Sequence, residues 1–147
     1  MSRTPPALAS RETGSITLWL LGLCVTLLFI GGISLDLWRA FSTRRALAGI
    51  VDAAAIAGAS SVDQDHLRRS GQARLDPVEA EALALARVDG HPEAVLVSGR
   101  SATATVDEIT VTAAGSVDLT LLRILAPAGG PLDVQVSARS APRQGPR

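Results

Sequence analysis

The sequence predicts an α+β protein in which a long N-terminal transmembrane helix continues outside the membrane and is followed by a small domain of one helix on an antiparallel sheet of about four strands. Three observations support this prediction. Residues 15–34 contain no charge, residues 35–60 are rich in Ala and Leu without proline, and beyond residue 92 apolar residues alternate with polar ones. The 147 residues leave room for only one small domain outside the bilayer.

The uncharged run at residues 15–34 has the length of a retained membrane span. Its 20 residues, at about 1.5 Å each, cover about 30 Å, which matches the hydrocarbon thickness of a bilayer. A cleaved secretory signal would have a shorter apolar core and a small-residue cleavage site, whereas residues 35–39 read LDLWR. A lipoprotein signal fits poorly, because Leu23 precedes Cys24 where a small residue is expected. We expect a single-pass anchor in the lipid bilayer, and the flanking arginines do not decide its orientation.

The helix is expected to continue through residues 35–60, which gives one rod of about 45 residues. Trp38 and Phe41 follow the span at the position of an interfacial aromatic belt. Asp36 is placed to pair with Arg39 one turn further on.

Small residues recur every four positions along this extension in two adjacent stripes, and such stripes let helices approach closely. One stripe contains Gly49, Ala53 and Ala57, and the other contains Ala46, Ile50, Ala54 and Gly58. The full set of expected helix-packing residues is Asp36, Arg39, Arg45, Gly49, Asp52, Ala53, Ala54, Ala57 and Gly58. If the stripes bind a partner, the double substitution Ala54→Leu with Gly58→Leu should disrupt that association.

Asp52 interrupts the otherwise apolar part of the extension, two turns from Arg45 on roughly the same face. One interpretation is a charge pair at a helix interface. The other is a solvated carboxylate on an Ala-rich surface helix, and the sequence does not choose between them.

Four features occur in order along residues 11–59. They are a basic residue and Gly14 before the apolar run, an Asp-x-x-Arg step at 36–39, an Arg-Arg-x-Leu step at 44–47, and VDAAAIAGA at 51–59. Together they resemble the TadE/TadG-like proteins of the bacterial tight-adherence (Flp) pilus system, especially the N-terminal module of the TadG-like branch.

This resemblance implies a single-pass protein of the bacterial cell membrane with a cytoplasmic N-terminus and a C-terminal domain outside the cytoplasm. It also implies a role in pilus assembly, or as a minor pilin-like subunit of the cell envelope or a related secretion apparatus. The partners would be other pilus-assembly or envelope proteins bound through the N-terminal helix, with a second copy of the chain left open.

Pilin-like members of this system are cut by a prepilin peptidase after a glycine, with Glu at the fifth position beyond the cut. Gly14 followed by Ser15 resembles such a site. The fifth position is Trp19, however, and no acidic residue occurs between Ser15 and Leu35. Cleavage and entry into a filament therefore stay open.

The expected order of segments is a cytoplasmic leader at 1–14, the helix and its extension at 15–60, a linker at 61–75, the small domain at 76–140 and a disordered tail at 141–147. The domain should begin with a helix, because Asp76 is a typical N-cap, Pro77 suits the first helical position and Glu79 completes a capping box. Its expected apolar face consists of Leu75, Val78, Ala82 and Leu85.

The alternation beyond Pro92 predicts strands near residues 94–98, 102–106, 109–113 and 132–139, with turns at 98–100 and 107–108. Residues 117–127 fit either a short helix or an edge segment. The apolar volume of this unit is small, so we expect the Ala-rich end of the first helix, or a partner protein, to complete its core.

Residue patterns disfavour catalysis, and we expect no catalytic residue, cofactor or metal site. His66 and His91 lack the spacing of zinc ligands, and Asp63 and Asp65 lack the pattern of a calcium loop. Fourteen basic and 14 acidic residues give no net charge to attract nucleic acid. The main alternative is a membrane-tethered ligand-binding or sensing module, whose domain should fold and bind without residues 1–60.

Overall fold

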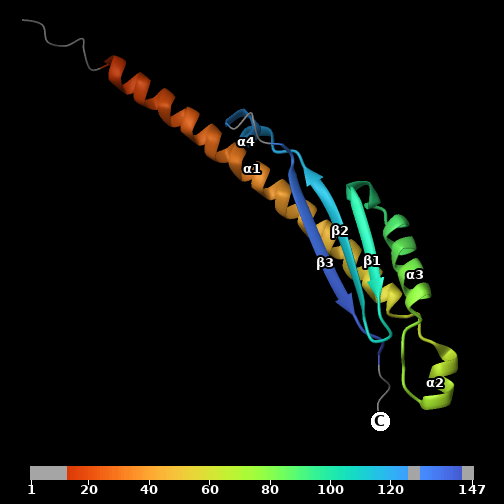
Figure 1. The fold of residues 1–147 in the computed structure, drawn as a ribbon. Coiled ribbons are helices and arrows are strands. Elements are labelled where there is room, and N and C mark those ends of the chain that lie inside the picture. The colour runs from red at the N-terminus through yellow and green to blue at the C-terminus, as the bar shows by residue number, and fades with distance from the viewer. Residues whose placement is uncertain (1–12, 126–129, 144–147) are drawn as a thin grey trace, which may run out of the picture.

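The computed structural model describes residues 13–125 and 130–143, and places a small α+β domain along the C-terminal half of one long helix (Figure 1). Helix α1 spans Thr13–Gly58, a continuous 46 residues. The elements that follow are α2 (Gln64–Ser70), α3 (Pro77–Asp89), the 3-10 helix η1 (Ala94–Leu96), β1 (Gly99–Ala104), β2 (Ile109–Val117), α4 (Thr120–Leu125) and β3 (Leu132–Ser140). The α+β class and the long first helix are confirmed.

The sheet is antiparallel with strand order β1-β2-β3. Strands β1 and β2 form a hairpin in which Ala104 pairs with Ile109, and β3 pairs with β2 along nine positions from Ile109 opposite Ser140 to Val117 opposite Leu132. The predicted turn near residues 107–108 is closed by Thr105, whose N–H donates to the Glu108 carbonyl at 2.8 Å.

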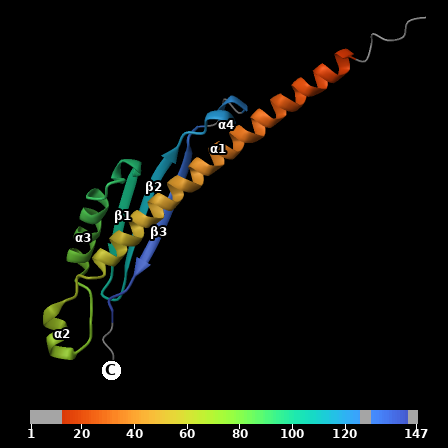
Figure 2. The same ribbon diagram turned by 180° about the vertical axis from the view of Figure 1, so that it is seen from behind.

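Helices α1 and α3 cover the same face of the sheet, with α1 across β2 and β3 and α3 beside β1 (Figure 2). Along β2 the residues facing these helices are buried, whereas Thr110 and Thr112 on the opposite face are half-buried. This alternation is the burial pattern expected of a sheet packed on one side. The fully buried core comprises Leu47, Ile50, Val51, Ala54, Ala55, Leu75, Ala80, Ala84, Val88, Ile109, Val111 and Ala113.

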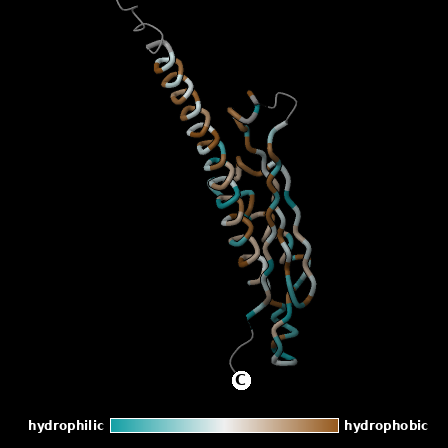
Figure 3. The backbone as a smooth tube through the Cα atoms, turned by 90° about the vertical axis from the view of Figure 1, so that its left-hand side faces the viewer, coloured by the Kyte–Doolittle hydropathy of each residue, from teal (hydrophilic) through white to brown (hydrophobic). Residues whose placement is uncertain are grey.

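The C-terminal half of α1 supplies a large share of this core, from Leu47 to Ala55. The core is therefore completed by the chain's own first helix. Residues 15–31 of α1 are all exposed and run clear of the domain, and Figure 3 shows the apolar residues of this part in brown.

The described residues form three strands, not about four, because the segment near 94–98 does not join the sheet. The amides of Leu96 and Val97 donate to the carbonyls of Glu93 and Ala94, both at 3.0 Å, which gives a 3-10 turn. The expected turn at 98–100 is also wrong. Ser98 donates to the Ala114 carbonyl at 2.8 Å and Gly99 begins β1, so this stretch is the entry to the hairpin.

The predicted linker at 61–75 contains helix α2, which has no apolar periodicity to indicate it. Asp63 caps its start by accepting from the His66 N–H at 2.9 Å. Gly71 ends it with a φ of 70°, and its N–H donates to Leu67 at 2.8 Å. The helix has seven residues and buries none of them, so its caps are the signals that define it.

Helix α3 forms as predicted, and Asp76 accepts hydrogen bonds from the N–H groups of Val78 and Glu79. Of its predicted apolar face, Leu75 is buried as expected, but Val78 is 79% exposed, Ala82 is exposed and Leu85 is half-buried. The buried residues within the helix itself are Ala80, Ala84 and Val88. Small side chains occupy the buried face of α3 because this helix packs so closely against the end of α1 that larger ones would not fit.

The closeness of that packing can be measured at Gly58. A Cβ atom at Gly58 would lie 2.9 Å from the Ala80 carbonyl oxygen and 3.2 Å from the Ala84 Cβ. Only glycine fits at this position without a shift of the neighbouring backbone.

Candidate functional site

The N-terminal half of α1 exposes a continuous apolar surface. Within the described part of the chain, one helix is long and apolar enough to cross a membrane, and its most apolar window has a mean hydropathy of 2.3 with none of it buried. Leu28, for example, is 74% exposed. Moving each such side chain out of water is worth about 1.5–3 kcal/mol, so this surface favours a lipid environment.

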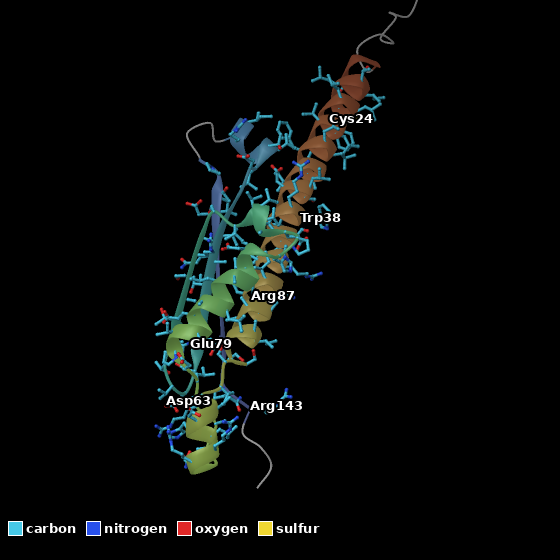
Figure 4. All side chains as sticks on the ribbon, turned by 90° about the vertical axis from the view of Figure 1, so that its right-hand side faces the viewer. Cys24, Trp38, Asp63, Glu79, Arg87 and Arg143 are labelled. Carbon is cyan, nitrogen blue, oxygen red and sulfur yellow. The ribbon has the colours of Figure 1, made fainter. Side chains whose placement is uncertain are left out.

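Gly14 and Ser15 lie in the first turn of α1, which begins at Thr13. Most of the predicted leader lies outside the described residues. The cysteine in the apolar run, Cys24, is exposed on the projecting half of α1 (Figure 4).

Asp36 follows the apolar run and is the centre of a polar contact between α1 and α4. Its side chain is buried, with the residue 1% exposed. Its Oδ1 accepts from the Thr120 N–H at 3.1 Å, and its Oδ2 accepts from the Leu121 N–H at 2.7 Å. Free N–H groups at the start of a helix attract a carboxylate, so Asp36 on one helix caps another that follows 84 positions later.

Arg39 closes the same contact from the next turn of α1. Its Nη1 donates to the Thr120 Oγ1 at 3.1 Å and lies 4.0 Å from the Asp36 Oδ1. The predicted Asp36–Arg39 pairing is present, although the shorter bonds of Asp36 go to α4. A buried carboxylate needs such partners, because removing a charge from water without compensation is costly.

Gly32 is the point where α4 lies against α1. A Cβ atom there would overlap the Cδ1 of Leu121. The neighbouring Gly31 has nothing within 4 Å of the same hypothetical atom. The contact of α4 with α1 therefore combines an apolar contact at Gly32 with the polar contact at Asp36, one turn apart.

The predicted small-residue stripes divide between the inside and the outside of the molecule. Ala54 and Gly58 are buried in the chain's own core, and Ala53 and Ala57 are half-buried. Gly49 is exposed, with open space around it. Close helix approach thus occurs within the chain, and leucines at 54 and 58 would disrupt the domain before they tested any association.

The face of α1 opposite Asp36 is free, and Trp38 lies on the side away from the sheet (Figure 4). We call this face the outer stripe, and it consists of Trp38, Phe41, Arg45, Asp52 and Ile56. All five are exposed, and no ion pair joins Arg45 to Asp52 among the described side chains. Asp52 therefore matches the solvated alternative within a single chain.

Titratable groups elsewhere form no metal centre in the described parts of the chain, where no three His, Cys, Asp or Glu residues gather. His91 Nδ1 accepts from the Glu93 N–H at 3.2 Å, which is a turn contact. The hydrogen bond from the His66 backbone N–H lowers the pKa of Asp63 below its ordinary value of 3.8.

The sequence did not indicate Thr120 and Leu121 as the partners of Asp36, nor Gly32 as the residue beside the Leu121 side chain. A carboxylate at the end of a membrane span indicates that a partner is needed. Nothing in the sequence says that the partner is a backbone more than 80 residues away.

Among the described residues, one long apolar helix is exposed over its N-terminal half and built into a small sheet domain over its C-terminal half, an arrangement consistent with single-pass membrane anchoring. Residues 14–61 match the Tad family model, described as Flp pilus-assembly TadE/G-like. The resemblance is thereby confirmed for this segment, which covers 48 of the 147 residues. A TadE/G-like segment indicates a structural role in Flp pilus assembly. No curated protein and no solved structure matches the chain.

Proposed function

We propose that this protein is a membrane-held component of Flp pilus assembly that acts by helix packing and partner binding, with its N-terminus in the cytoplasm and its domain outside. The observation that carries the proposal is the family match at residues 14–61, which covers both the apolar half of α1 and the half built into the domain core. Assembly rather than catalysis suits a chain whose polar groups serve caps and helix contacts.

The continuity of α1 gives this role a physical basis. The helix leaves the membrane and enters the domain core without a break, because Leu47 and Ile50 belong to the same helix as the span. A partner that binds the helix outside the membrane therefore also fixes the position of the domain. The outer stripe is the surface of that helix left uncovered by the chain, and its apolar and charged residues suit a partner helix.

The role can be tested in cells that make Flp pili. Deleting the gene should lower the number of surface pili, and the intact gene should restore it. A photo-crosslinking residue at Phe41 or Ile56 on the outer stripe should yield adducts that mass spectrometry identifies as Flp pilus-assembly proteins. The matched control is Val78, which is also apolar and exposed but lies on α3. Normal piliation in the deletion strain would contradict the proposal.

The minor pilin-like form of this role depends on processing after Gly14. The intact mass and N-terminal sequence of the protein from native membranes distinguish the two forms. A chain that begins at Met1 or Ser2 is the assembly factor we expect, since no acidic residue follows the cut site within the span. A chain that begins at Ser15 would establish the pilin-like subunit instead.

Orientation is tested by labelling from one side of the membrane. In a Cys24→Ser background, which removes the single cysteine, the Val78→Cys variant should react with a membrane-impermeant maleimide in intact spheroplasts. A Ser2→Cys variant should react only after lysis. The reverse pattern would place the domain in the cytoplasm.

A further inference from the structure

Helix α4 contacts α1 at a level that the membrane span itself defines. The side chain of Leu121 fills the space beside Gly32. Gly32 lies within the uncharged run at 15–34, two residues before its end, which corresponds to about 3 Å along the helix axis. A bilayer that covers the run therefore reaches α4.

The composition and exposure of α4 suit this position. Its sequence is TLLRIL, so its six residues include four large apolar side chains and one cation. Ile124 is 67% exposed. Arg123 is exposed too, and a long cationic side chain beside apolar ones is typical of a helix at the boundary between headgroups and acyl chains.

The opposite face of α1 carries residues of the same kind at nearly the same level along the helix. Trp38 and Phe41, on the outer stripe, are 68% and 60% exposed and follow Asp36 within about a turn and a half. Aromatic side chains gather at this depth in membrane proteins. At the start of α4, Asp36 accepts from the N–H groups of Thr120 and Leu121, and Arg39 donates to the Thr120 hydroxyl, which lowers the cost of bringing these groups close to lipid.

The geometry points to α4 as a second membrane contact: a short interfacial helix that lies beside α1 in the bilayer boundary, with Ile124 among the acyl chains and Arg123 among the lipid phosphates. The partner is the lipid bilayer, because α4 is continuous with the surface of the span. This inference rests on membrane anchoring of α1 and is independent of any role in pilus assembly. Two points of contact hold the domain at a fixed tilt to the membrane.

The experiment measures how deeply a label at position 124 lies in the bilayer. The full chain with Cys24→Ser and Ile124→Cys carries an environment-sensitive fluorophore and is reconstituted in phosphatidylcholine and phosphatidylglycerol vesicles. Quenching is compared between a nitroxide attached to the lipid near its headgroup and aqueous iodide. Leu28→Cys is the reference inside the span. Val78→Cys is the matched control, because Val78 is exposed at the end of the domain near Gly58.

The label at position 124 should be quenched by the lipid nitroxide and protected from iodide, whereas the label at 78 should respond only to iodide. Adding Gly32→Leu should make position 124 accessible to iodide, whereas Gly31→Leu should leave it protected, because a side chain at 32 meets Leu121 and one at 31 begins where nothing lies within 4 Å.

Iodide quenching at 124 equal to that at 78 would overturn the inference. Protection from both quenchers would also overturn it, in favour of a protein partner on α4. Iodide quenching at 28 would show that the span itself is not in the bilayer, and would remove membrane anchoring along with the inference.

Discussion

Asp36 is a carboxylate held out of water where α1 leaves its apolar run, and each of its oxygens accepts a backbone N–H of α4. Neither N–H has a partner earlier in its own helix, because both belong to the first turn. The carboxylate and the start of α4 therefore satisfy one another: without α4 the buried carboxylate loses its two shortest hydrogen bonds, and without Asp36 the two N–H groups lose their acceptor.

The Asp36→Ala substitution tests this mutual dependence. It should lower the free energy of unfolding by about 1–3 kcal/mol, because two donors lose their acceptor. Thermal unfolding in detergent micelles measures the change. The control is Asp52→Ala, which removes the same group from an exposed position of the same helix and should stay within about 0.5 kcal/mol of the parent chain. Equal effects would contradict the assigned role of Asp36.

Gly58 and Gly49 provide a second test position and matched control within α1. Alanine at 58 would place its Cβ 2.5 Å from the Ile109 Cδ1 and 2.9 Å from the Ala80 carbonyl oxygen. It should destabilise the domain by about 1–3 kcal/mol through overpacking. Alanine at 49 meets open space and should stabilise the helix by about 0.4–1 kcal/mol. Chemical denaturation followed by circular dichroism distinguishes these opposite signs, and two changes of the same sign would refute the packing argument.

Because Asp63 caps α2, we expect the stability of this helix to depend on pH only in the acid range. Because the pKa of Asp63 is lower in the folded chain than its ordinary 3.8, the cap should be fully effective above about pH 4 and should weaken as the pH falls through the folded pKa. The opening free energy of residues 64–70, measured by amide hydrogen exchange, should be constant from pH 7 to about pH 4 and should decrease at lower pH. In Asp63→Ala this additional acid opening should be absent.

At the scale of elements, α1 joins two environments with one regular backbone. Residues 15–31 are all exposed, whereas the C-terminal half of α1 packs on α3, β2 and β3. Asp36 and Gly32 lie at the junction, where α4 makes its contact. The position of α4 is therefore determined by two residues of another helix.

Replacing Gly32 tests whether this residue determines the position of α4. Gly32→Leu should displace Leu121 and open the start of α4, so that the amides of Thr120 and Leu121 exchange faster with deuterated solvent. Gly31→Leu adds the same volume where nothing lies within 4 Å. It should leave α4 exchange unchanged. Unchanged exchange in both variants would mean that α4 does not depend on the Gly32 contact.

The elements differ in how well their sequences predict them. Helix α1 has a long proline-free apolar run and α3 has a complete N-cap, so local patterns suffice for both. Helix α2 has only its caps at Asp63 and Gly71, and η1 carries the same apolar residues that a strand would. The inward face of α3 could not be predicted from hydrophobicity, because contact with Gly58 favours Ala80 and Ala84 over larger residues.

At the scale of the whole molecule, the anchor and the domain share one structure. The candidate interface residues could be recognised as a group from their spacing, but their assignment to inside or outside depends on the sheet. Ala54 and Gly58 face inward, whereas Arg45, Gly49 and Asp52 face outward. Spacing along a helix indicates which residues share a face, and only the tertiary fold indicates what that face meets.

Truncation tests whether the domain needs α1, the anchor helix, in order to fold. A fragment of residues 61–147 lacks Leu47, Ile50, Val51 and the rest of the inner face of α1. It should be unfolded, with poor dispersion in its amide NMR spectrum. A fragment of residues 35–147 keeps that face and Asp36, and should fold with dispersed signals. Folding of the shorter fragment would show that α1 is only a tether, and would restore an independent binding domain as the alternative.

The packing of α1 against β3 also affects how the chain folds during its synthesis. Val51 leaves the ribosome about 80 residues before the start of β3, which at about 5–20 residues per second is an interval of roughly 4–16 s. Helix α3 and strand β2 are made within that interval and can cover part of the inner face of α1, but β3 arrives last. Until then Leu47, Ile50 and Val51 carry most of the uncovered apolar area of that face, because Ala54, Ala55 and Gly58 have small side chains.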